Sequence, residues 1–149
     1  MGNRQSLPDK LIRACEKGNL KLVKKLIEKG ADVNSIGENS EWDKRTPIGA
    51  AVEREHKDIV VYLLEKGADP VKTIYDGGWT PLMIAAAYNA DTDCIKLLLE
   101  QQNVIETINL SDFNGKTALD LAVTINKKKS SKQISNLLVQ KRGRQNLKM

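Results

Sequence analysis

The sequence has 149 residues, of which 40% are hydrophobic and 29% are charged, a size and composition typical of one soluble globular domain with a substantial core. No apolar run approaches the roughly 18 residues of a membrane-spanning helix, and the first residues lack the apolar segment of a secretory signal peptide. The net charge of +5 is uneven, because residues 121–149 contain eight Lys or Arg and no acidic residue. The basic character therefore belongs to the C-terminal end.

Residues 1–8 form a predicted N-terminal arm that begins MGNRQS. This stretch matches the pattern Met-Gly-x-x-x-Ser, in which Gly2 is an acceptor for N-myristoylation and Ser6 stands in the required place. One myristoyl chain gives only marginal, reversible membrane binding, so this hypothesis needs a second signal from the basic C-terminal end. The alternative is a chain that merely begins Met-Gly.

Four segments further along the chain share one plan. A Thr-Pro or its counterpart is followed by aliphatic residues, a pair of small residues and a late apolar pair, and EKGAD occurs twice, at 28–32 and 65–69. The segments begin 37, 34 and 37 residues apart, as the positions of their first residues show: Asp9, Thr46, Thr80 and Thr117. Such self-similarity at a fixed period is the signature of a repeat protein.

Each segment is predicted to be a short helix, a tight turn, a longer helix and a loop. Thr46, Thr80 and Thr117 stand at N-cap positions, and a Pro follows the first two. The second helices carry apolar residues at helical spacing, and a Gly follows two of these stripes as a helix stop. One such pair is too small to bury its apolar face, so the pairs are expected to stack into a continuous core.

These features resemble the ankyrin repeat family. The residues that carry the resemblance are Thr46-Pro47, Thr80-Pro81-Leu82, Ala50-Ala51, Ala85-Ala86, the two Gly-Ala-Asp triplets and the turn Asp112-Phe113-Asn114-Gly115. The resemblance implies an all-α ankyrin solenoid with β-turn fingers, with repeats at about 9–41, 42–75, 76–111 and 112–141. The remaining residues, 142–149, are predicted to form a basic, frayed tail. The chain departs from the family pattern in lacking the His that usually follows Thr-Pro-Leu. It also carries extra residues between the helices of the last two repeats.

The resemblance further implies a monomeric, non-enzymatic module that binds a protein partner on the concave face made by the fingers and first helices. Aligned by repeat, the candidate partner-binding residues are aromatic side chains edged by cations: Trp42, Trp79, Tyr88 and Phe113, with Arg45, Arg54 and Lys116. Aromatic and Arg side chains dominate interface energetics, and the cations would favour an acidic or extended partner segment. A Trp before Thr-Pro can instead simply lean across the next finger.

Three other functions are weighed against this one. A peripheral membrane adaptor, or a host-directed effector, would use an acylated Gly2. A nucleic-acid contact would use residues 127–148, but no aromatic residue follows Phe113 to supply stacking. An enzyme has little support, because the only His, His56, lies in a turn where the family uses it for backbone bonding. No motif indicates a metal or cofactor, and Cys15 and Cys94 are expected to be buried free thiols of a reducing, cytoplasmic compartment.

Overall fold

The computed structural model describes residues 5–38, 44–73, 77–126, 128 and 131–147. Within these residues the secondary structure is helical, with one isolated antiparallel bridge between Ser111 and Thr117 and no strand. The helices are α1 (Leu7–Lys17), α2 (Leu20–Glu28), α3 (Pro47–Glu53), α4 (Lys57–Glu65), α5 (Pro81–Tyr88), α6 (Asp93–Leu99), α7 (Gln102–Glu106), α8 (Ala118–Thr124) and α9 (Ser131–Leu147). The prediction of an all-α repeat solenoid is confirmed.

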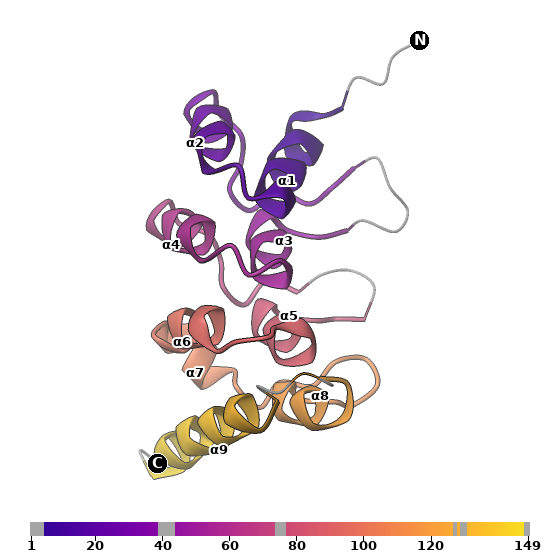
Figure 1. Ribbon diagram of the computed structural model, residues 1–149, viewed down its shortest axis with the longest axis vertical. Helices are drawn as coiled ribbons and strands as arrows, with labels where there is room; N and C mark the ends of the chain where they lie inside the picture. Colours follow the sequence, from indigo (N-terminus) through magenta and orange to yellow (C-terminus); the bar gives the residue numbers. More distant parts are fainter. Residues whose placement is uncertain (1–4, 39–43, 74–76, 127, 129–130, 148–149) are drawn as a thin grey trace.

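The helices form two layers that run the length of the molecule (Figure 1). One layer contains the first helix of each pair, with α1 packed on α3, α3 on α5 and α5 on α8. The other contains the second helices, with α2 on α4 and α4 on α6. The described parts of the loops that join successive pairs lie on the side of the first-helix layer (Figure 1). Each pair therefore contacts mainly its neighbours along the stack, as expected of a solenoid.

Hydroxyl side chains cap the first helix of every pair. The side chains of Thr46, Thr80 and Thr117 accept hydrogen bonds from backbone N–H groups three residues ahead, as their N-cap positions predict. Ser6 caps α1 in the same way by accepting from the N–H of Asp9. Because Ser6 is the cap, the first helix begins at Leu7 and includes the last two residues of the predicted N-terminal arm, Leu7 and Pro8.

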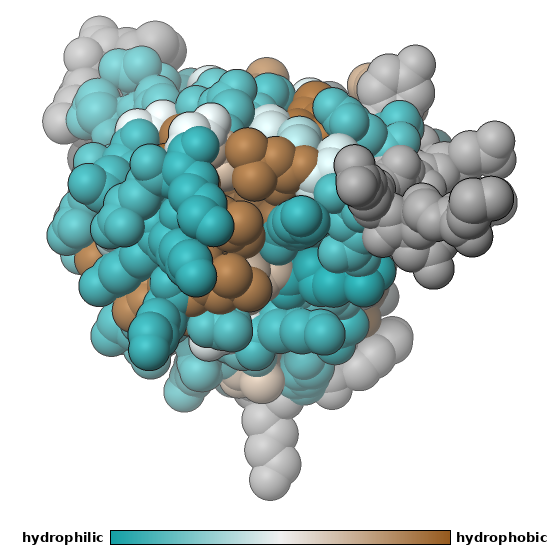
Figure 2. All heavy atoms as spheres, turned by 90° about the horizontal axis from the view of Figure 1, so that it is seen from above, coloured by the Kyte–Doolittle hydropathy of each residue, from teal (hydrophilic) through white to brown (hydrophobic). Residues whose placement is uncertain are grey.

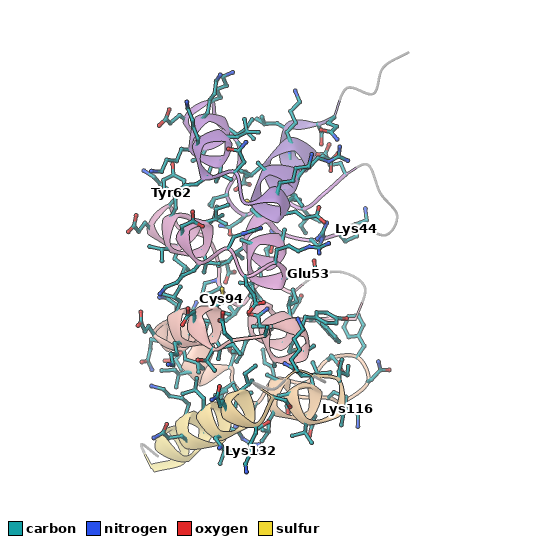
Figure 3. All side chains as sticks on the ribbon, in the orientation of Figure 1. Lys44, Glu53, Tyr62, Cys94, Lys116 and Lys132 are labelled. Atoms are coloured by element: carbon teal, nitrogen blue, oxygen red, sulfur yellow. The ribbon has the colours of Figure 1, made fainter. Side chains whose placement is uncertain are left out.

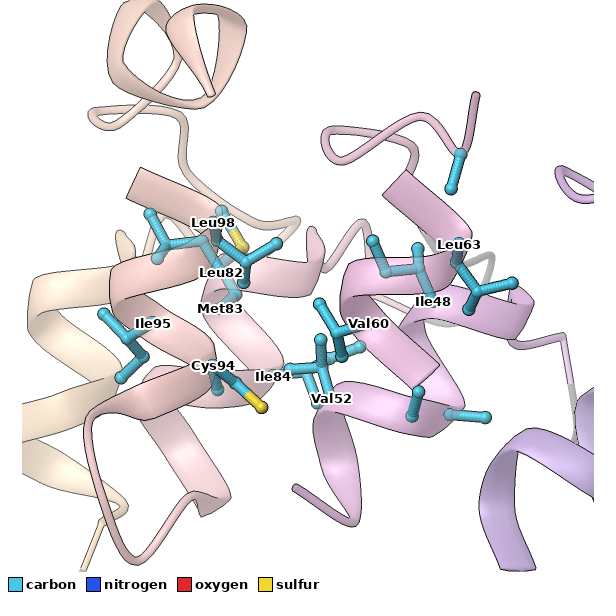
Figure 4. Close-up of a cluster of buried hydrophobic side chains, with 14 of the residues drawn as sticks. Ile48, Val52, Val60, Leu63, Leu82, Met83, Ile84, Cys94, Ile95 and Leu98 are labelled. Atoms are coloured by element: carbon cyan, nitrogen blue, oxygen red, sulfur yellow. The ribbon is translucent and has the colours of Figure 1, made fainter. Parts of the chain in front are cut away.

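The core is one continuous aliphatic cluster between the two layers. Figure 4 shows part of it, where Val52 and Val60 of one pair meet Ile84 and Cys94 of the next. Both cysteines are free and buried, as predicted. Burial raises the pKa of the Cys15 and Cys94 thiols to about 12, which keeps them protonated and unreactive at neutral pH.

The C-terminal quarter differs from the prediction in two ways. A short helix, α7, follows α6 and packs against α9. In addition, α9 continues to Leu147, so residues 142–147 extend the last helix and the expected frayed tail is wrong for them. Gly143 alone does not end the helix, since a single Gly costs only about 1 kcal/mol relative to Ala. None of the helices within the described residues has both the length and the apolar character needed to span a bilayer.

Candidate functional site

The side chain of Trp79 precedes the N-cap of α5 and is half-buried. Its indole N–H donates a hydrogen bond of 2.8 Å to the carboxylate of Asp112, which belongs to the next finger. Its ring lies against Tyr88, the last residue of α5, with 5.7 Å between the ring centres and 39° between the planes. Trp79 thus leans across the next finger, and it also supports an aromatic neighbour that is 42% exposed.

Asp112 organises the finger that receives this bond. Its carboxylate also accepts from the backbone N–H groups of Asn114 and Lys116, both at 2.9 Å. The hydrogen bond from the Lys116 backbone is the main cause that lowers the pKa of Asp112, and the Trp79 indole lowers it further. Asp112 is therefore ionised at neutral pH, and hydrogen bonds to its charged form stabilise the finger.

Phe113 follows Asp112 and is 79% exposed. Its backbone N–H donates to the carbonyl oxygen of Gly77 at 2.9 Å, and its ring covers Gly78, where an added Cβ would lie 2.8 Å from the Phe113 Cε1. Trp79, Tyr88 and Phe113 are thereby joined through two neighbouring fingers and the end of α5. We call these three residues the aromatic surface.

Two of the predicted cations, Arg45 and Arg54, are already paired with carboxylates. Arg45 forms ion pairs with Glu53 at 2.7 Å and with Glu16 at 3.2 Å, and Arg54 pairs with Glu16 at 3.3 Å. Figure 3 places Glu53 on the loop side of the stack together with Lys44 and Lys116. The first two repeats therefore present a network of both charge signs on this side, where the sequence predicted a basic edge.

The other residues that the sequence singled out lie at several places on the molecule or outside the described residues. Lys116 is exposed on the Asp112 finger. Trp42 and Gly2 lie outside the described residues. In the basic C-terminal end, the Lys128 ammonium donates to the backbone oxygen of Tyr88, and Lys132 is exposed on α9.

Three side chains in the turns between helices form hydrogen bonds to the preceding helix pair. The sequence predicted this role for His56 and did not predict it for Asn89 and Asn126. His56 contacts the backbone oxygen of Glu16 at 2.9 Å, as the family's turn histidine predicts. Asn89 donates to the Val52 oxygen at 2.8 Å, and Asn126 donates to the Ala86 oxygen at 2.9 Å. Each side chain thus bonds to the end of the first helix of the preceding pair. The signal was available, because Asn89 and Asn126 occupy the same repeat position.

A groove that the sequence did not predict lies between α6 and α9. Its volume is about 670 Å³, and it is lined mainly by polar side chains: Thr92, Lys96, Gln133, Asn136, Leu137, Val139 and Gln140. The short α7 packs against both flanking helices near this groove. Within the part of the chain that the structure describes, no three His, Cys, Asp or Glu side chains gather as metal ligands would.

Comparison with known families gives one match that covers nearly the whole chain. The family model described as "Ankyrin repeats (3 copies)" matches residues 8–74 and again residues 71–148.

In the curated relatives, the matching segment is a small part of the whole protein. The human 2-5A-dependent ribonuclease is 40% identical over 87 residues, which are 57% of this chain and 11% of that protein. Protein lin-12 of Caenorhabditis elegans is 34% identical over 119 residues, 80% of this chain and 8% of that protein. The mouse ankyrin repeat domain-containing protein 40 is 41% identical over 61 residues, 41% of this chain and 16% of that protein. The chain thus corresponds to a small portion of each of these relatives.

Proposed function

Because the chain belongs to the ankyrin repeat family, we propose that it binds a protein partner through the concave face of the stack, with the aromatic surface at the centre of the contact. Ankyrin repeats generally mediate protein–protein interaction, and they generally have no chemistry of their own. The ribonuclease activity named for one relative is not carried over, because the similarity covers only 11% of that protein.

The observation that carries this proposal is the exposure of Phe113 and Tyr88 beside a fixed Trp79. Phe113 is 79% exposed and Tyr88 42% exposed, although both rings are large and apolar. Aromatic side chains are enriched at the centres of interfaces and account for most of the binding free energy there. An exposed aromatic cluster on a monomer is therefore a favoured contact surface.

Rigidity supports the same proposal. Trp79 is held by the hydrogen bond to Asp112 and by the Tyr88 ring, while the Asp112 finger is held by its own carboxylate. A preformed surface loses little conformational entropy on binding. Arg45 pairs with Glu16 and Glu53, and Arg54 pairs with Glu16, so the loop side of the first two repeats carries both signs of charge. The proposal therefore does not require an acidic partner.

The test compares two pairs of substitutions in exposed apolar residues. The first variant carries Tyr88→Ser and Phe113→Ser, and its matched control carries Leu110→Ser and Val139→Ser, which are also exposed. A partner is captured with the wild-type protein, purified, and titrated against all three proteins by calorimetry. Loss of two interface aromatics is expected to weaken binding by about thirtyfold or more, with the control unchanged.

Trp79 is left intact in this design because its indole bonds to Asp112, so its loss would also disturb the finger. Folding of each variant is checked by circular dichroism. If the aromatic variant and its control bind the partner equally well, the aromatic surface is not the contact and the proposal is wrong.

A further inference from the structure

The end of the stack formed by α1 and α2 presents side chains that the inner pairs do not. When the repeats are aligned, four positions of this end correspond to residues that are buried or partly buried in the second and third repeats. The corresponding residues, one from each of those repeats, are Pro47 and Pro81, Ala50 and Ile84, Ile59 and Cys94, and Tyr62 and Leu97. In the first repeat the same positions hold Lys10, Arg13, Leu22 and Lys25, all exposed. This pattern arises because α1 and α2 form the end of the described stack.

The acidic residues of these two helices do not balance the cations. The Asp9 carboxylate accepts hydrogen bonds from the Ser6 hydroxyl and from the backbone N–H of Glu38. Glu16 is paired with Arg45 and Arg54. Glu28 corresponds by repeat to Glu65 and Glu100, which are also exposed. An exposed Glu therefore stands at this position in the inner repeats as well, and it is not a special feature of the end. The end therefore combines cations with few competing carboxylates.

Apolar side chains are exposed among these cations. Leu7 of α1 is 37% exposed and Leu22 of α2 is 38% exposed. Figure 2, which looks onto this end of the molecule, shows a hydrophobic patch in the middle of a hydrophilic surround. A solenoid end needs only a polar outer face to remain soluble, and that need explains neither the excess of cations nor the exposed leucines.

We propose that this end, comprising Leu7, Lys10, Arg13, Leu22 and Lys25, docks on an anionic lipid membrane. Lys and Arg near such a surface are attracted to its anionic headgroups. Apolar side chains on the same face enter the boundary between headgroups and acyl chains. The proposal concerns the unmodified chain and does not depend on acylation of Gly2.

Two other anionic partners fit this end less well. Single-stranded nucleic acid is bound with aromatic stacking platforms, and the first aromatic residue of the sequence is Trp42. Phosphate contacts also provide no role for Leu7 and Leu22. An acidic protein segment would use the cations equally well, but the leucines would then need a complementary apolar partner, which a bilayer supplies without specific shape.

This surface is separate from the aromatic surface, which is formed by α5 and the fingers next to it. A membrane-docked molecule can therefore still bind a protein partner. For the same reason the two proposals fail independently, because neither test changes a residue used in the other.

The experiment measures co-sedimentation of the purified, unacylated protein with vesicles of phosphatidylcholine alone or with 30% phosphatidylserine. A charge variant carries Lys10→Gln, Arg13→Gln and Lys25→Gln. Its matched control carries Lys57→Gln, Lys96→Gln and Lys132→Gln, which remove the same charge from exposed positions on α4, α6 and α9. A third variant, Leu7→Gln with Leu22→Gln, tests the apolar contribution.

We expect binding to the anionic vesicles only. Each cation near the surface contributes about fivefold, so the charge variant should bind about a hundredfold more weakly, and raised salt should weaken binding further. The control should bind like the wild type, and the leucine variant should bind several-fold more weakly.

Four results would overturn the proposal: no binding to anionic vesicles, equal binding to neutral vesicles, equal losses in the charge variant and its control, or no loss in the leucine variant. The same proteins are titrated with a fluorescent single-stranded RNA and with polyglutamate at the same ionic strength. Tighter binding of either polyanion than of the vesicles, lost in the charge variant alone, would assign this end to that partner and not to a membrane.

Discussion

Gly78 has no side chain, and this allows the ring of Phe113 to lie against its backbone. Its φ of +69° lies in the left-handed region, and a Cβ at this position would lie 2.8 Å from the Phe113 ring. Gly115, in the finger of Asp112, also has a positive φ, +77°, but no atom lies within 4 Å of its missing Cβ. The left-handed backbone therefore favours glycine at both positions. Only at Gly78 would an added Cβ also meet a neighbouring side chain, that of Phe113.

This difference gives a prediction for paired substitutions. Gly78→Ala and Gly115→Ala should each destabilise the protein by about 1–2 kcal/mol, because an L-residue is strained at positive φ. Only Gly78→Ala should also displace the ring of Phe113. Phe113 is the only Phe of the sequence, so a protein labelled at Phe gives a single set of ring signals in NMR spectra. Equal shifts of these signals in the two variants would contradict the placement of Phe113 over Gly78.

At the residue scale, the sequence predicted which side chains lie in the fingers better than it predicted their contacts. The fingers and the position before each Thr follow from the repeat alignment, so Trp79 and Phe113 were assigned to fingers. The pairing of Arg45 with Glu53 and Glu16 was not predicted, because it depends on the direction in which a loop presents its side chain to two different helices. Repeat alignment gives positions along the chain, and it does not give such side-chain directions.

The turn side chains His56, Asn89 and Asn126 make polar contacts between neighbouring helix pairs. Asn126 is buried, and its amide donates to the backbone oxygens of Ala86 and Asn89 at 2.9 and 3.1 Å. These carbonyl groups lie at the end of α5, where no helical N–H follows to bond them. The amide therefore compensates for burial of this helix end when the fourth pair packs onto the third.

Replacing Asn126 by Ala should consequently destabilise the stack by roughly 1–3 kcal/mol, the range for leaving a buried hydrogen-bonding group unsatisfied. The matched control is Asn136→Ala on α9, where the side chain is exposed at the rim of the groove, and it should change stability by less than about 0.5 kcal/mol. Urea unfolding followed by circular dichroism measures both. If the two variants lose equal stability, the hydrogen bonds of Asn126 do not hold the pairs together.

At the element scale, helices that follow the repeat were predicted, and elements that interrupt it were not. The Thr caps and apolar stripes are local signals, so α3, α4, α5 and α6 begin close to their expected positions. By contrast, α7 occupies Gln102–Glu106, only five residues, which is too short for a helical period to be recognised. The length of α9 was underestimated because a run of cations without apolar partners gives no periodic signal.

The described helix pairs form a linear array in which each pair packs mainly against its neighbours. Leu63 of α4 and Leu138 of α9 are both fully buried, but the pair of α4 has neighbours on two sides and the pair of α9 has described neighbours on one. In such an array stability is approximately a sum of terms for single repeats and for contacts between adjacent repeats. Local unfolding should therefore begin at the ends of the stack.

Leu63→Ala and Leu138→Ala test this directly. Each leaves a cavity that costs about 2–5 kcal/mol, so the chemical change is matched and only the position in the array differs. Hydrogen exchange read by mass spectrometry should show faster exchange confined to α8 and α9 for Leu138→Ala, with α1–α4 unchanged. For Leu63→Ala, exchange should rise in the pairs on both sides of α4, because loss of a central pair uncouples its neighbours. A uniform rise across all helices in Leu138→Ala would instead mean that the repeats unfold as one cooperative unit.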